Sequence, residues 1–423
     1  MSEEQFTPQA PTGTHDVMPP ESFRWQALVA KFASMATAYG FGLVHTPMFE
    51  DVRVFHRGLG DAAEVVSKEM YDFEDRGGRH LALRPEGTAP VVRAFIQHRP
   101  ATPFKAWYAS PSFRYERPQA GRYRQHHQLG VEVIGSDDAD LDIEVIELAS
   151  RFFRDLGLQH VVLKINSMGC SACRPAYVEQ LKVHLQAHEV DLCDEHGERW
   201  ASNPLRVLDC KKPGCIGVTT IGPMLRDHLC AACAEHHHHV VAGLAEVGVD
   251  SVQDDRLVRG FDYYTRTTFE FAATSLESAQ NAIGGGGRYD GLVELLGGPA
   301  TPGIGFGVGM ERVLLACDAE TTFSVAAPTP RVFVVDVTGG THARTLVATL
   351  RQAGVFAERA YDSRSMKSQL KVADRSGAAF AAIIGEQEAA SGSVTIRALR
   401  HEADQETLSV EEFLTRFTSQ GDQ

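Results

Sequence analysis

The chain has 423 residues and a formal net charge of −14 at pH 7, with 43% hydrophobic and 23% charged residues. This length allows two or three domains with sizeable cores, and the acidic balance argues against a non-specific nucleic-acid coat. Its apolar runs are shorter than the ~20 residues that cross a membrane, and its acidic start lacks the apolar stretch of a secretory signal. We therefore expect a cytoplasmic protein whose eight cysteines are reduced thiols or metal ligands.

The first part of the chain combines helices with several strands. Residues 23–39 have helical periodicity and end at Gly40, and FGLVHTPMFED predicts a strand interrupted at Pro47. Further strand patterns occur in RHLALRP, AWYASPSFRYE and QLGVEVIG, and DLDIEVIELASRFFRDLG predicts a helix. Strand patterns resume at RLVRGFDYYTRTTFEFAA and at GIGFGVG.

Two further blocks differ from this body in composition. Residues 165–253 hold seven of the eight cysteines and little strand pattern, so they predict a mainly helical insertion. After the loose stretch AETTFSVAAPTP, strands such as RVFVVDV alternate with helices such as THARTLVATLRQAG. We expect a body at 1–164 and 254–325, a Cys-rich insertion at 165–253 and a small α/β domain at 330–423.

Four arginines gather in RYERPQAGRYRQHHQ, namely Arg114, Arg117, Arg122 and Arg124. The loop PQAGR has the residues of a hairpin turn, and charged edge strands of hairpins commonly deter aggregation. In an acidic protein, however, so tight a cluster also suits the binding of an anion such as phosphate. Arg114 and Glu116 are expected to point the same way.

The strand QLGVEVIG has two contrasting faces, because side chains alternate across a sheet. Its apolar face consists of Leu129, Val131 and Val133, and we expect it to pack in the core. Its other face presents Gln128, Gly130, Glu132 and Ile134. Gln128 and Glu132 beside a glycine predict a polar recognition face with room for a ligand.

Glycines recur with period two in GIGFGVGMER, at Gly303, Gly305, Gly307 and Gly309. They leave one strand face without side chains, which often marks the close approach of a ligand and suits a planar ring. Close packing of a helix is the structural alternative. A dinucleotide fingerprint is excluded because Met310 stands at its third glycine position.

Three shorter motifs add polar groups. LVRGFDYYTRT places Arg259 near Asp262, Tyr263 and Tyr264, and arginine suits recognition of carboxylate or phosphate. LRPEGT, with Glu86 and Thr88, predicts a turn that could hold a cationic amine. IGGGGRYDGL around Arg288 could be a simple glycine loop.

The cysteines of the insertion fall into close pairs. Cys170 and Cys173, like Cys230 and Cys233, have zinc-finger spacing, and between them lie Cys193, His196, Cys210 and Cys215. These residues could form one or two tetrahedral Zn²⁺ sites, with the two outer pairs as the better site. The alternative is a set of reduced, partly buried cysteines. We expect the run His236–His239 to be exposed.

Taken together, these motifs resemble those of one enzyme family. FRYERPQAGRYRQHHQ and GIGFGVGMER resemble motifs 2 and 3 of class II aminoacyl-tRNA synthetases, and Pro47 fits the proline of motif 1 at their dimer interface. LVRGFDYYTRT, GGRYDGL and LRPEGT are similar to segments of histidyl-tRNA synthetases, and the block after Arg331 resembles their anticodon-binding domain. The resemblance implies an α+β fold, namely an antiparallel sheet body with flanking helices, a mainly helical insertion and a C-terminal α/β anticodon-binding domain.

The resemblance also implies the reaction, the partners and the residue roles. The chain would be a homodimeric histidine–tRNA ligase that uses ATP and Mg²⁺ to activate L-histidine and charge its tRNA. The implied ATP-binding residues are Arg114, Glu116, Arg122 and Arg312, with Arg114 and Arg259 as the catalytic pair. The implied histidine-binding residues are Glu86, Thr88, Gln128, Glu132, Arg259, Tyr263 and Tyr264. The tRNA acceptor end would meet Arg117, Gln119 and Arg124.

One residue departs from the family pattern, and two other functions are open. His126 stands where family members often have the phenylalanine that stacks on adenine, so we expect a smaller stacking surface and a contact that depends on pH. A catalytically silent paralogue that regulates histidine biosynthesis would share the body, but it is expected to lose the active-site arginines and the last domain. A stand-alone tRNA-binding module would not need the residues that suit histidine. The retained Arg114, Arg259 and Arg312 favour the enzyme.

Overall fold

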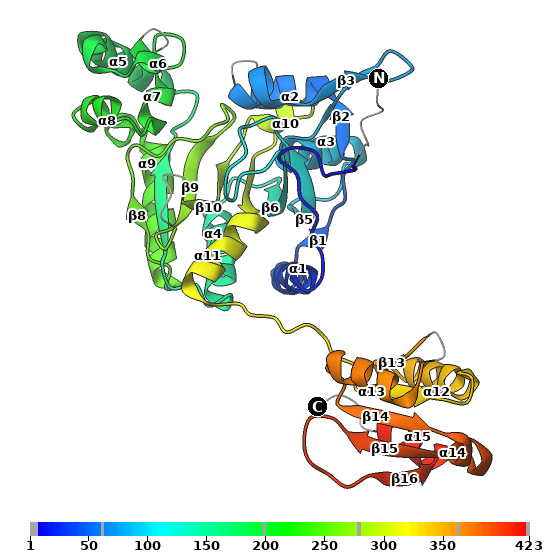
Figure 1. Cartoon of the computed structure of the whole chain (residues 1–423). Helices are drawn as coiled ribbons and strands as arrows, with labels where there is room; N and C mark the ends of the chain where they lie inside the picture. The colour runs from blue at the N-terminus through cyan, green and yellow to red at the C-terminus, as the bar shows by residue number, and fades with distance from the viewer. Residues whose placement is uncertain (1–6, 61–62, 198–199, 277–280, 362–363, 420–423) are drawn as a thin grey trace. The chain divides into compact units, whose positions relative to one another are not determined.

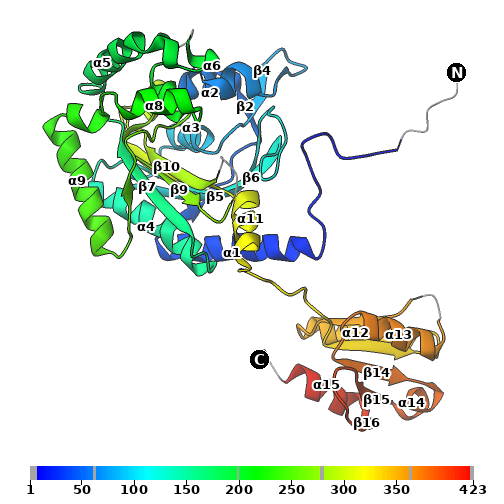
Figure 2. The ribbon, with the colours of Figure 1, turned by 60° about the vertical axis from the view of Figure 1, so that its left-hand side comes forward.

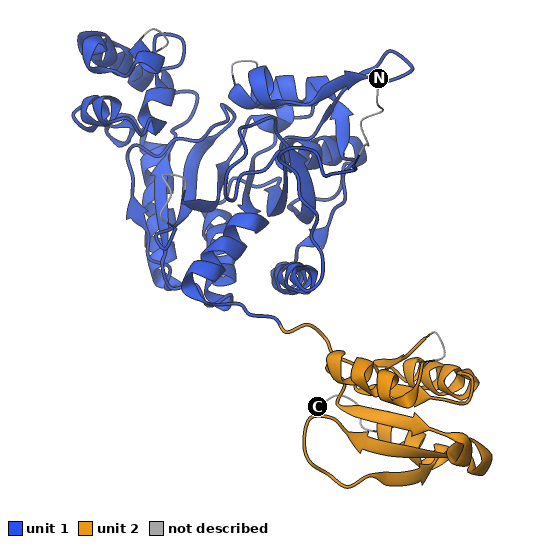
Figure 3. Cartoon of the chain, in the orientation of Figure 1, with its two compact units in different colours: residues 1–325 blue, residues 326–423 orange. Residues whose placement is uncertain are grey.

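The computed structural model describes residues 7–60, 63–197, 200–276, 281–361 and 364–419. The chain divides into two compact units, Met1–Val325 and Ala326–Gln423 (Figure 3). Each unit has hydrophobic clusters of its own. The fold is α+β, because a largely antiparallel sheet forms the centre of the first unit and a mixed sheet that of the second.

The first unit is built on an eight-stranded sheet (Figure 1). Its strands, in spatial order, are β1 (Gly42–Leu43), β5 (Phe104–Phe113), β6 (Gln125–Ile134), β11 (Gly303–Gly309), β10 (Ala282–Arg288), β9 (Thr265–Ala273), β7 (Val161–Ser167) and β8 (Val252–Gln253). Only the two outermost pairs, β1–β5 and β7–β8, are parallel. The register of β6 and β11 sets Glu132 opposite Gly305 and Gln128 opposite Gly309, so the polar and glycine-rich motifs meet at the sheet centre.

Helices cover the apolar face of this sheet, as the alternation in β6 predicts. Leu129, Val131 and Val133 are fully buried there. The covering helices are α1 (Glu21–Ala38), α4 (Ala139–Asp155), α9 (Ala231–Glu246) and α11 (Met310–Glu320), all of which contribute to one core cluster (Figure 2). Burying this face leaves the opposite, polar face of β6 and β11 to form a site.

Shorter elements surround the opposite face of the sheet. They are α2 (Val52–Leu59), a π-helical turn (Val65–Glu69), α3 (Thr88–His98), α10 (Leu292–Leu295) and a small sheet of β2 (Phe49–Asp51), β4 (His80–Leu83) and β3 (Asp72–Glu74). Their core cluster includes the aromatic rings of Tyr263, Tyr264 and Tyr289. The expected strand at residues 256–273 begins only at Thr265, so Arg259, Tyr263 and Tyr264 lie on the loop that precedes β9.

The cysteine-rich stretch is mainly helical. It contains α5 (Arg174–Ala187), α6 (Asp194–Gly197), α7 (Leu205–Asp209), α8 (Pro213–Thr220), two short 3₁₀ turns (Glu189–Asp191 and Leu225–His228) and α9. Tyr177, Leu181, Leu185 and Val207 form the centre of a small separate core. Both ends of the predicted insertion lie in strands of the large sheet, because β7 continues to Ser167 and β8 ends at Gln253.

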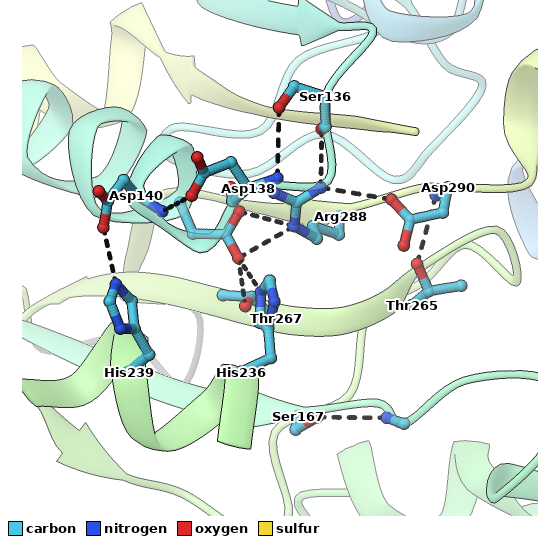
Figure 4. Close-up of polar contacts among 12 residues, drawn as sticks. Ser136, Asp138, Asp140, Ser167, His236, His239, Thr265, Thr267, Arg288 and Asp290 are labelled. Carbon is cyan, nitrogen blue, oxygen red and sulfur yellow. Dashed lines mark hydrogen bonds and ion pairs between the residues drawn. The ribbon is translucent and has the colours of Figure 1, made fainter. Parts of the chain in front are cut away.

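A buried polar network joins α9 to the body (Figure 4). Asp142 on α4 is fully buried and accepts hydrogen bonds from Thr267 Oγ1 at 2.7 Å and Arg288 Nε at 3.1 Å, and it pairs with His236 Nε2 at 2.5 Å. Arg288 also donates to the carbonyl oxygens of Ser136 and Asp138. The interpretation of IGGGGRYDGL as a simple glycine loop was wrong, since residues up to Arg288 form strand β10.

The expectation that His236–His239 is an exposed run was wrong for His236. This residue is buried, and it shares the inward stripe of α9 with Cys233, Val240 and Leu244. A helix turns about 100° per residue, so four consecutive histidines cannot all face solvent when the helix lies against a body. Its neighbour His239 is exposed and pairs with Asp140 at 2.7 Å.

The second unit is a five-stranded mixed sheet with helices. The strand order is β13 (Ala357–Arg359), β12 (Val332–Asp336), β14 (Phe380–Ile384), β15 (Ser393–Ala398) and β16 (Glu406–Ser409). Its helices are α12 (Thr341–Gln352), α13 (Met366–Arg375), α14 (Glu386–Ser391) and α15 (Val410–Thr418). The predicted β/α alternation is confirmed, while the short α14 and β16 were not foreseen.

Candidate active site

A buried carboxylate, Glu132, forms the floor of the site. It lies on the polar face of β6 and is fully buried. Its Oε1 accepts a hydrogen bond from Thr88 Oγ1 at 2.7 Å, and its Oε2 accepts one from Tyr289 OH at 2.6 Å. Burial raises the pKa of Glu132 to about 8, although the hydrogen bonds from Tyr289 and Thr88 lower it. Such a group is poised to form a hydrogen bond to a polar ligand.

Glycines make room for this carboxylate and for an aromatic wall. A Cβ at Gly305 would lie 1.9 Å from Glu132 Oε2 and 2.5 Å from the Val131 carbonyl oxygen. A Cβ at Gly130 or Gly87 would lie 2.3 or 2.4 Å from the ring of Tyr108. At Gly307 the nearest atoms are Gln128 Nε2 at 3.7 Å and Tyr108 OH at 3.9 Å. The glycine face is therefore packed at Gly305 and open above Gly307.

The loop before β9 closes the site with aromatic rings. Tyr263 and Tyr264 are nearly buried, and their ring centroids are 4.6 Å apart. Tyr263 also stacks on Phe261 at 5.4 Å and meets the edge of Tyr289 at 5.9 Å. Burial raises the pKa of Tyr263 and of Tyr264, so both phenols are hydrogen-bond donors at neutral pH.

Glu86, Thr88 and Gln128 border the same floor. Glu86 is buried and accepts hydrogen bonds from the backbone N–H groups of Thr88 and Ala89, both at 2.7 Å. It thereby caps α3, and burial raises its pKa. Gln128 accepts a hydrogen bond from Ser112 Oγ at 3.2 Å. Of these residues Thr88 contacts Glu132 directly, and Gln128 lies on the same strand, β6.

Two arginines, Arg114 and Arg312, lie near the glycine face and donate to backbone carbonyl groups. Arg114 donates to the Pro85 carbonyl oxygen at 2.9 Å, and Arg312 donates to those of Gly121 and Ala282. Burial lowers the pKa of Arg312, and repulsion from Arg122 and Arg114 adds to the effect. The pKa of Arg114 is lowered by burial and by Arg259, against the opposing influence of Glu69 and Glu86. Mutual repulsion of this kind is relieved by a bound anion.

Arg259 completes this row from the opposite loop. Its guanidinium lies over Gly285 of β10, where a Cβ would approach it to 2.9 Å. Its Nη1 pairs with Glu270 at 3.1 Å. Burial acts to lower its pKa, but Tyr264 and Glu270 outweigh it and the pKa is raised. Within the described residues, Arg259 Nε is buried without a hydrogen-bond partner, which leaves a donor available to a ligand.

The loop between β5 and β6 carries the remaining predicted residues. β5 ends at Phe113, so Arg114 and Glu116 lie beyond the strand. The expectation that their side chains share one strand face was therefore wrong. Glu116 forms an ion pair with Arg122, and an isolated bridge joins Gln119 to Arg122.

The other two arginines of this loop differ in exposure. Arg117 is exposed. Arg124 is half-buried. Its guanidinium lies 4.0 Å from the Tyr115 ring centroid, and its backbone N–H donates to the Gly13 carbonyl oxygen at 2.7 Å.

His126 faces this arginine row in its neutral form. Its pKa is lowered to about 3, first by burial and then by Arg114, His127 and Arg312. Its Nδ1 is buried and, in the part of the chain that the structure describes, has no hydrogen-bond partner. A neutral imidazole of this kind offers a flat face that does not change charge between pH 5 and 9.

Sequence reasoning missed the roles of Tyr108 and Tyr289. Tyr108 OH lies 3.4 Å from Glu132 Oε1, and Tyr289 donates to Oε2. The sequence offered two signals, namely Gly130 within QLGVEVIG and the position of Tyr289 within GGRYDGL. In the structure, Gly130 lies opposite Tyr108 in the β5–β6 pair. Neither signal says which face a tyrosine takes without the register.

Seven cysteines and one histidine of the helical stretch form two groups of four side chains. Cys170, Cys173, Cys230 and Cys233 form one group, and Cys193, His196, Cys210 and Cys215 form the other. None of the described helices is long and apolar enough to cross a membrane.

The sequence and the fold of the chain were compared with those of known proteins. The family model for histidyl-tRNA synthetase matches residues 13–190 and 220–313, and that for an anticodon-binding domain matches residues 331–420. A histidine–tRNA ligase from Moorella thermoacetica is 48% identical over 396 residues, covering 92% of this chain and 93% of the relative. One from Dehalococcoides mccartyi is 43% identical, covering 97% and 99% of the two chains. The crystal structure of apo histidyl-tRNA synthetase from S. aureus superposes with a TM-score of 0.82 at 33% identity, covering 97% and 100%. The chain belongs to the histidyl-tRNA synthetase family of class II aminoacyl-tRNA synthetases.

Proposed function

We propose that the protein is a histidine–tRNA ligase. A carboxylate oxygen of L-histidine attacks the α-phosphorus of ATP, the bond to the bridging oxygen breaks, and pyrophosphate leaves. Histidine then passes from the adenylate to the 3′-terminal ribose of its tRNA. The observation that carries this proposal is the row of mutually repelling arginines beside the buried niche of Glu132.

The arginines suit the first step on electrostatic grounds. Attack of a carboxylate on a phosphate brings two anions together, and fixed cations stabilise the charge that develops. In the proposal, Arg114 and Arg259 hold the α-phosphate and the histidine carboxylate from two sides. Arg122 and Arg312 hold the β- and γ-phosphates, and Glu116 lies near the adenine. The free Nε of Arg259 supports its assignment.

ATP is expected to bring Mg²⁺ to the site. The carboxylates near the arginine row, Glu116 and Glu270, are paired with Arg122 and Arg259, and both are hard oxygen donors that suit Mg²⁺. When bound, the ion would neutralise phosphate charge and orient the leaving group. No general base is needed, because the attacking carboxylate is already ionised.

The Glu132 niche suits a histidine side chain. An imidazole has a nitrogen at each end, so one carboxyl group and one phenol can specify it. We assign these roles to Glu132 and Tyr264, with Tyr263 lining the niche. We assign the α-amino group to Glu86, Thr88 and Gln128, which border the same floor. An amino acid without such nitrogens would lose the proposed hydrogen bonds to Glu132 and Tyr264.

Two surfaces suit the tRNA. The loop of Arg117, Gln119 and Arg124 borders the arginine row, and we assign it to the acceptor end. In the second unit, a cavity of about 250 Å³ is lined by Arg351, Arg359 and Tyr361 among others. The Arg359 guanidinium lies 4.6 Å from the Tyr361 ring centroid, and such a pair suits stacking with a base.

The same comparison supports the division of labour along the chain. We assign the catalytic body to residues 1–164 and 254–325, the insertion to 165–253 and anticodon binding to 330–423. We further propose that the body forms a homodimer through the segment around Pro47. Large apolar side chains are exposed there, with Met48 at 52%, Phe49 at 51% and Phe73 at 42%, and such a patch marks an interface.

The proposal is tested by ATP–pyrophosphate exchange with each amino acid separately, in the presence of Mg²⁺ and without tRNA. Exchange driven by histidine alone is the expected result. Folded protein that gives no exchange with any amino acid would contradict the proposal and favour the regulatory paralogue. Exchange with a different amino acid would show that the roles of Glu132 and Tyr264 are misassigned.

A further inference from the structure

Two clusters of metal-ligand residues lie in the helical insertion, outside the site of adenylate formation. Within each cluster the four ligand atoms lie within 4.8 Å of one another. We propose that each cluster binds one Zn²⁺ ion, so that each chain holds two structural zinc ions. The first site would consist of Cys170, Cys173, Cys230 and Cys233, and the second of Cys193, His196, Cys210 and Cys215.

The sulfur–sulfur distances of the first cluster match a zinc tetrahedron. Cys170 Sγ lies 3.7 Å from Cys173 Sγ and 3.9 Å from Cys230 Sγ, and Cys173 Sγ lies 3.9 Å from Cys233 Sγ. A tetrahedral ion with zinc–sulfur bonds of ~2.3 Å has sulfur–sulfur edges of about 3.8 Å. A disulfide needs ~2.05 Å, so these thiols are spaced for a shared ion and not for pairing.

The second cluster has the same spacing with one histidine. Cys193 Sγ lies 3.8 Å from Cys210 Sγ and 3.2 Å from His196 Nδ1. The backbone N–H of Cys193 donates to Cys215 Sγ at 3.4 Å, which places the fourth ligand in the group. Three sulfurs and one imidazole nitrogen are a common donor set of structural zinc.

The local backbone favours thiolates at the first site. Cys173 directly precedes α5 and Cys230 directly precedes α9, and the positive end of a helix dipole stabilises a negative ligand. The N–H of Cys170 donates to Cys173 Sγ at 3.2 Å. Soft thiolate ligands exclude Mg²⁺ and Ca²⁺, and tetrahedral sulfur and nitrogen sites select zinc.

The two sites would hold parts of the insertion that have little core of their own. The separate core there is small, with Tyr177 and Leu181 at its centre, and metal ions commonly replace an insufficient core. The stretch 191–219 lies between the two segments that match the histidyl-tRNA synthetase model, and it carries all four ligands of the second site. The second ion would therefore organise a part of the insertion that the family model does not describe.

The first site is also connected to the proposed histidine niche. Arg174, which follows Cys173, donates to the carbonyl oxygens of Met168, at 2.8 Å, and Tyr264. The N–H of Arg266 donates to the Gly169 carbonyl oxygen at 2.8 Å. An ion at Cys170 and Cys173 would thus fix the strand end against the loop that carries Tyr264.

The first test is metal analysis of the full-length protein, purified without a histidine tag or added metal. Two zinc ions per chain are expected by inductively coupled plasma mass spectrometry. Cys170→Ser and Cys210→Ser should each retain one, and Cys317→Ser, which changes a buried cysteine of α11 outside both clusters, should retain two. A wild-type chain with fewer than two bound ions, or with iron in place of zinc, would overturn the proposal.

A second test uses only the wild-type chain, so it holds even if a variant does not fold. Titration with a mercurial reagent should release two zinc ions. A separate sample that is denatured with a chelator, without the mercurial, should show all eight cysteines as free thiols. Pairs of missing thiols would show disulfides instead and refute both sites. Cobalt substitution should give thiolate-to-metal absorption bands, and their absence would count against thiolate ligation.

A third measurement addresses the connection to the histidine niche, and it is separate from the metal count. In pyrophosphate exchange, Cys170→Ser should raise KM for histidine by roughly tenfold and change KM for ATP less. Cys317→Ser should leave both values unchanged. Equal changes in both KM values would refute the connection through Arg174, while the zinc count decides the sites themselves.

Discussion

Arg259 is the residue whose removal should separate binding from chemistry. Its guanidinium is proposed to stabilise charge that appears only as the phosphate bond forms, so Arg259→Ala should lower kcat of pyrophosphate exchange by ~10²- to 10³-fold. Histidine affinity, measured by calorimetry, should largely survive. Arg53→Ala changes an exposed arginine and serves as the control. Equal loss of histidine binding and of kcat would show that the role is misassigned.

Glu132 should show opposite effects on recognition and on stability. Glu132→Gln keeps the shape but replaces one of the two acceptor oxygens with an NH2 donor, so histidine-dependent exchange should fall by roughly 10- to 100-fold. Burial raises the pKa of Glu132 from the ordinary value of a glutamate to about 8. Between these two values the folded state binds more protons than the unfolded state, so stability falls as pH rises through this window.

The effect on stability is measured by thermal unfolding of wild type and Glu132→Gln at pH 6 and pH 9. Relative to wild type, the Tm of Glu132→Gln should be higher at pH 9 than at pH 6, because the glutamine does not ionise. A difference in Tm that is the same at both pH values would contradict a buried carboxyl with a raised pKa.

His126 should act through its flat surface and not through its charge. His126→Ala should raise KM for ATP by about tenfold, since stacking of a base on a ring contributes ~1–3 kcal/mol. His126→Phe should keep KM at or below the wild-type value. KM for ATP should show no inflection near pH 6.5, because the pKa of His126 is lowered to about 3. An inflection there that His126→Phe removes would disprove the neutral form.

At the scale of the element, strand β11 provides a matched pair of substitutions. A methyl group at Gly305 would collide with Glu132 and the Val131 carbonyl, so Gly305→Ala should destabilise the protein by ~1–3 kcal/mol and abolish exchange. Gly307→Ala meets no described atom closer than 3.7 Å and should keep the wild-type Tm. It should nevertheless weaken histidine-dependent exchange, because its methyl group enters the proposed ligand space. Full activity of Gly307→Ala would place the ligand elsewhere.

Elements with a clear hydrophobic period were predictable from the sequence. Leu129, Val131 and Val133 are buried as their alternation in β6 requires, and the helix expected at residues 23–39 is observed as Glu21–Ala38. The irregular segments were not predictable in the same way. The loop that carries Arg259 looks like a strand in sequence, and only its packing under the aromatic cluster shows that the strand begins at Thr265.

The contacts within the candidate site were also not predictable from the sequence. The residue types near Glu132 were named from motifs, but the partners of Glu132 depend on register. Tyr108 reaches it only because Gly130 lies opposite in the β5–β6 pair, and Tyr289 reaches it from the end of β10. The pairing of Arg288 and His236 with Asp142 was not predictable for a related reason, since Asp142 is distant from both in the sequence.

At the scale of the whole molecule, the exposed apolar residues near Pro47 predict the assembly. Phe49→Glu places a charge in the proposed dimer interface, so light scattering should give a dimer for wild type and a monomer for the variant at micromolar concentration. Val190→Glu is the matched control, because Val190 is 94% exposed on the insertion, and it should remain a dimer. A wild-type monomer would contradict the proposed interface.

The pairing of β7 with β9 has a consequence for the order in which the protein is made. These strands are neighbours in the sheet, yet the whole helical stretch is translated between them. β11, which pairs with β6, emerges later still. A ribosome-bound chain that ends before Gly303 therefore has Glu132 without its glycine neighbour and Arg114 without Arg312. The proposed ATP-binding surface is therefore completed only when β11 and α11, which carries Arg312, have left the ribosome.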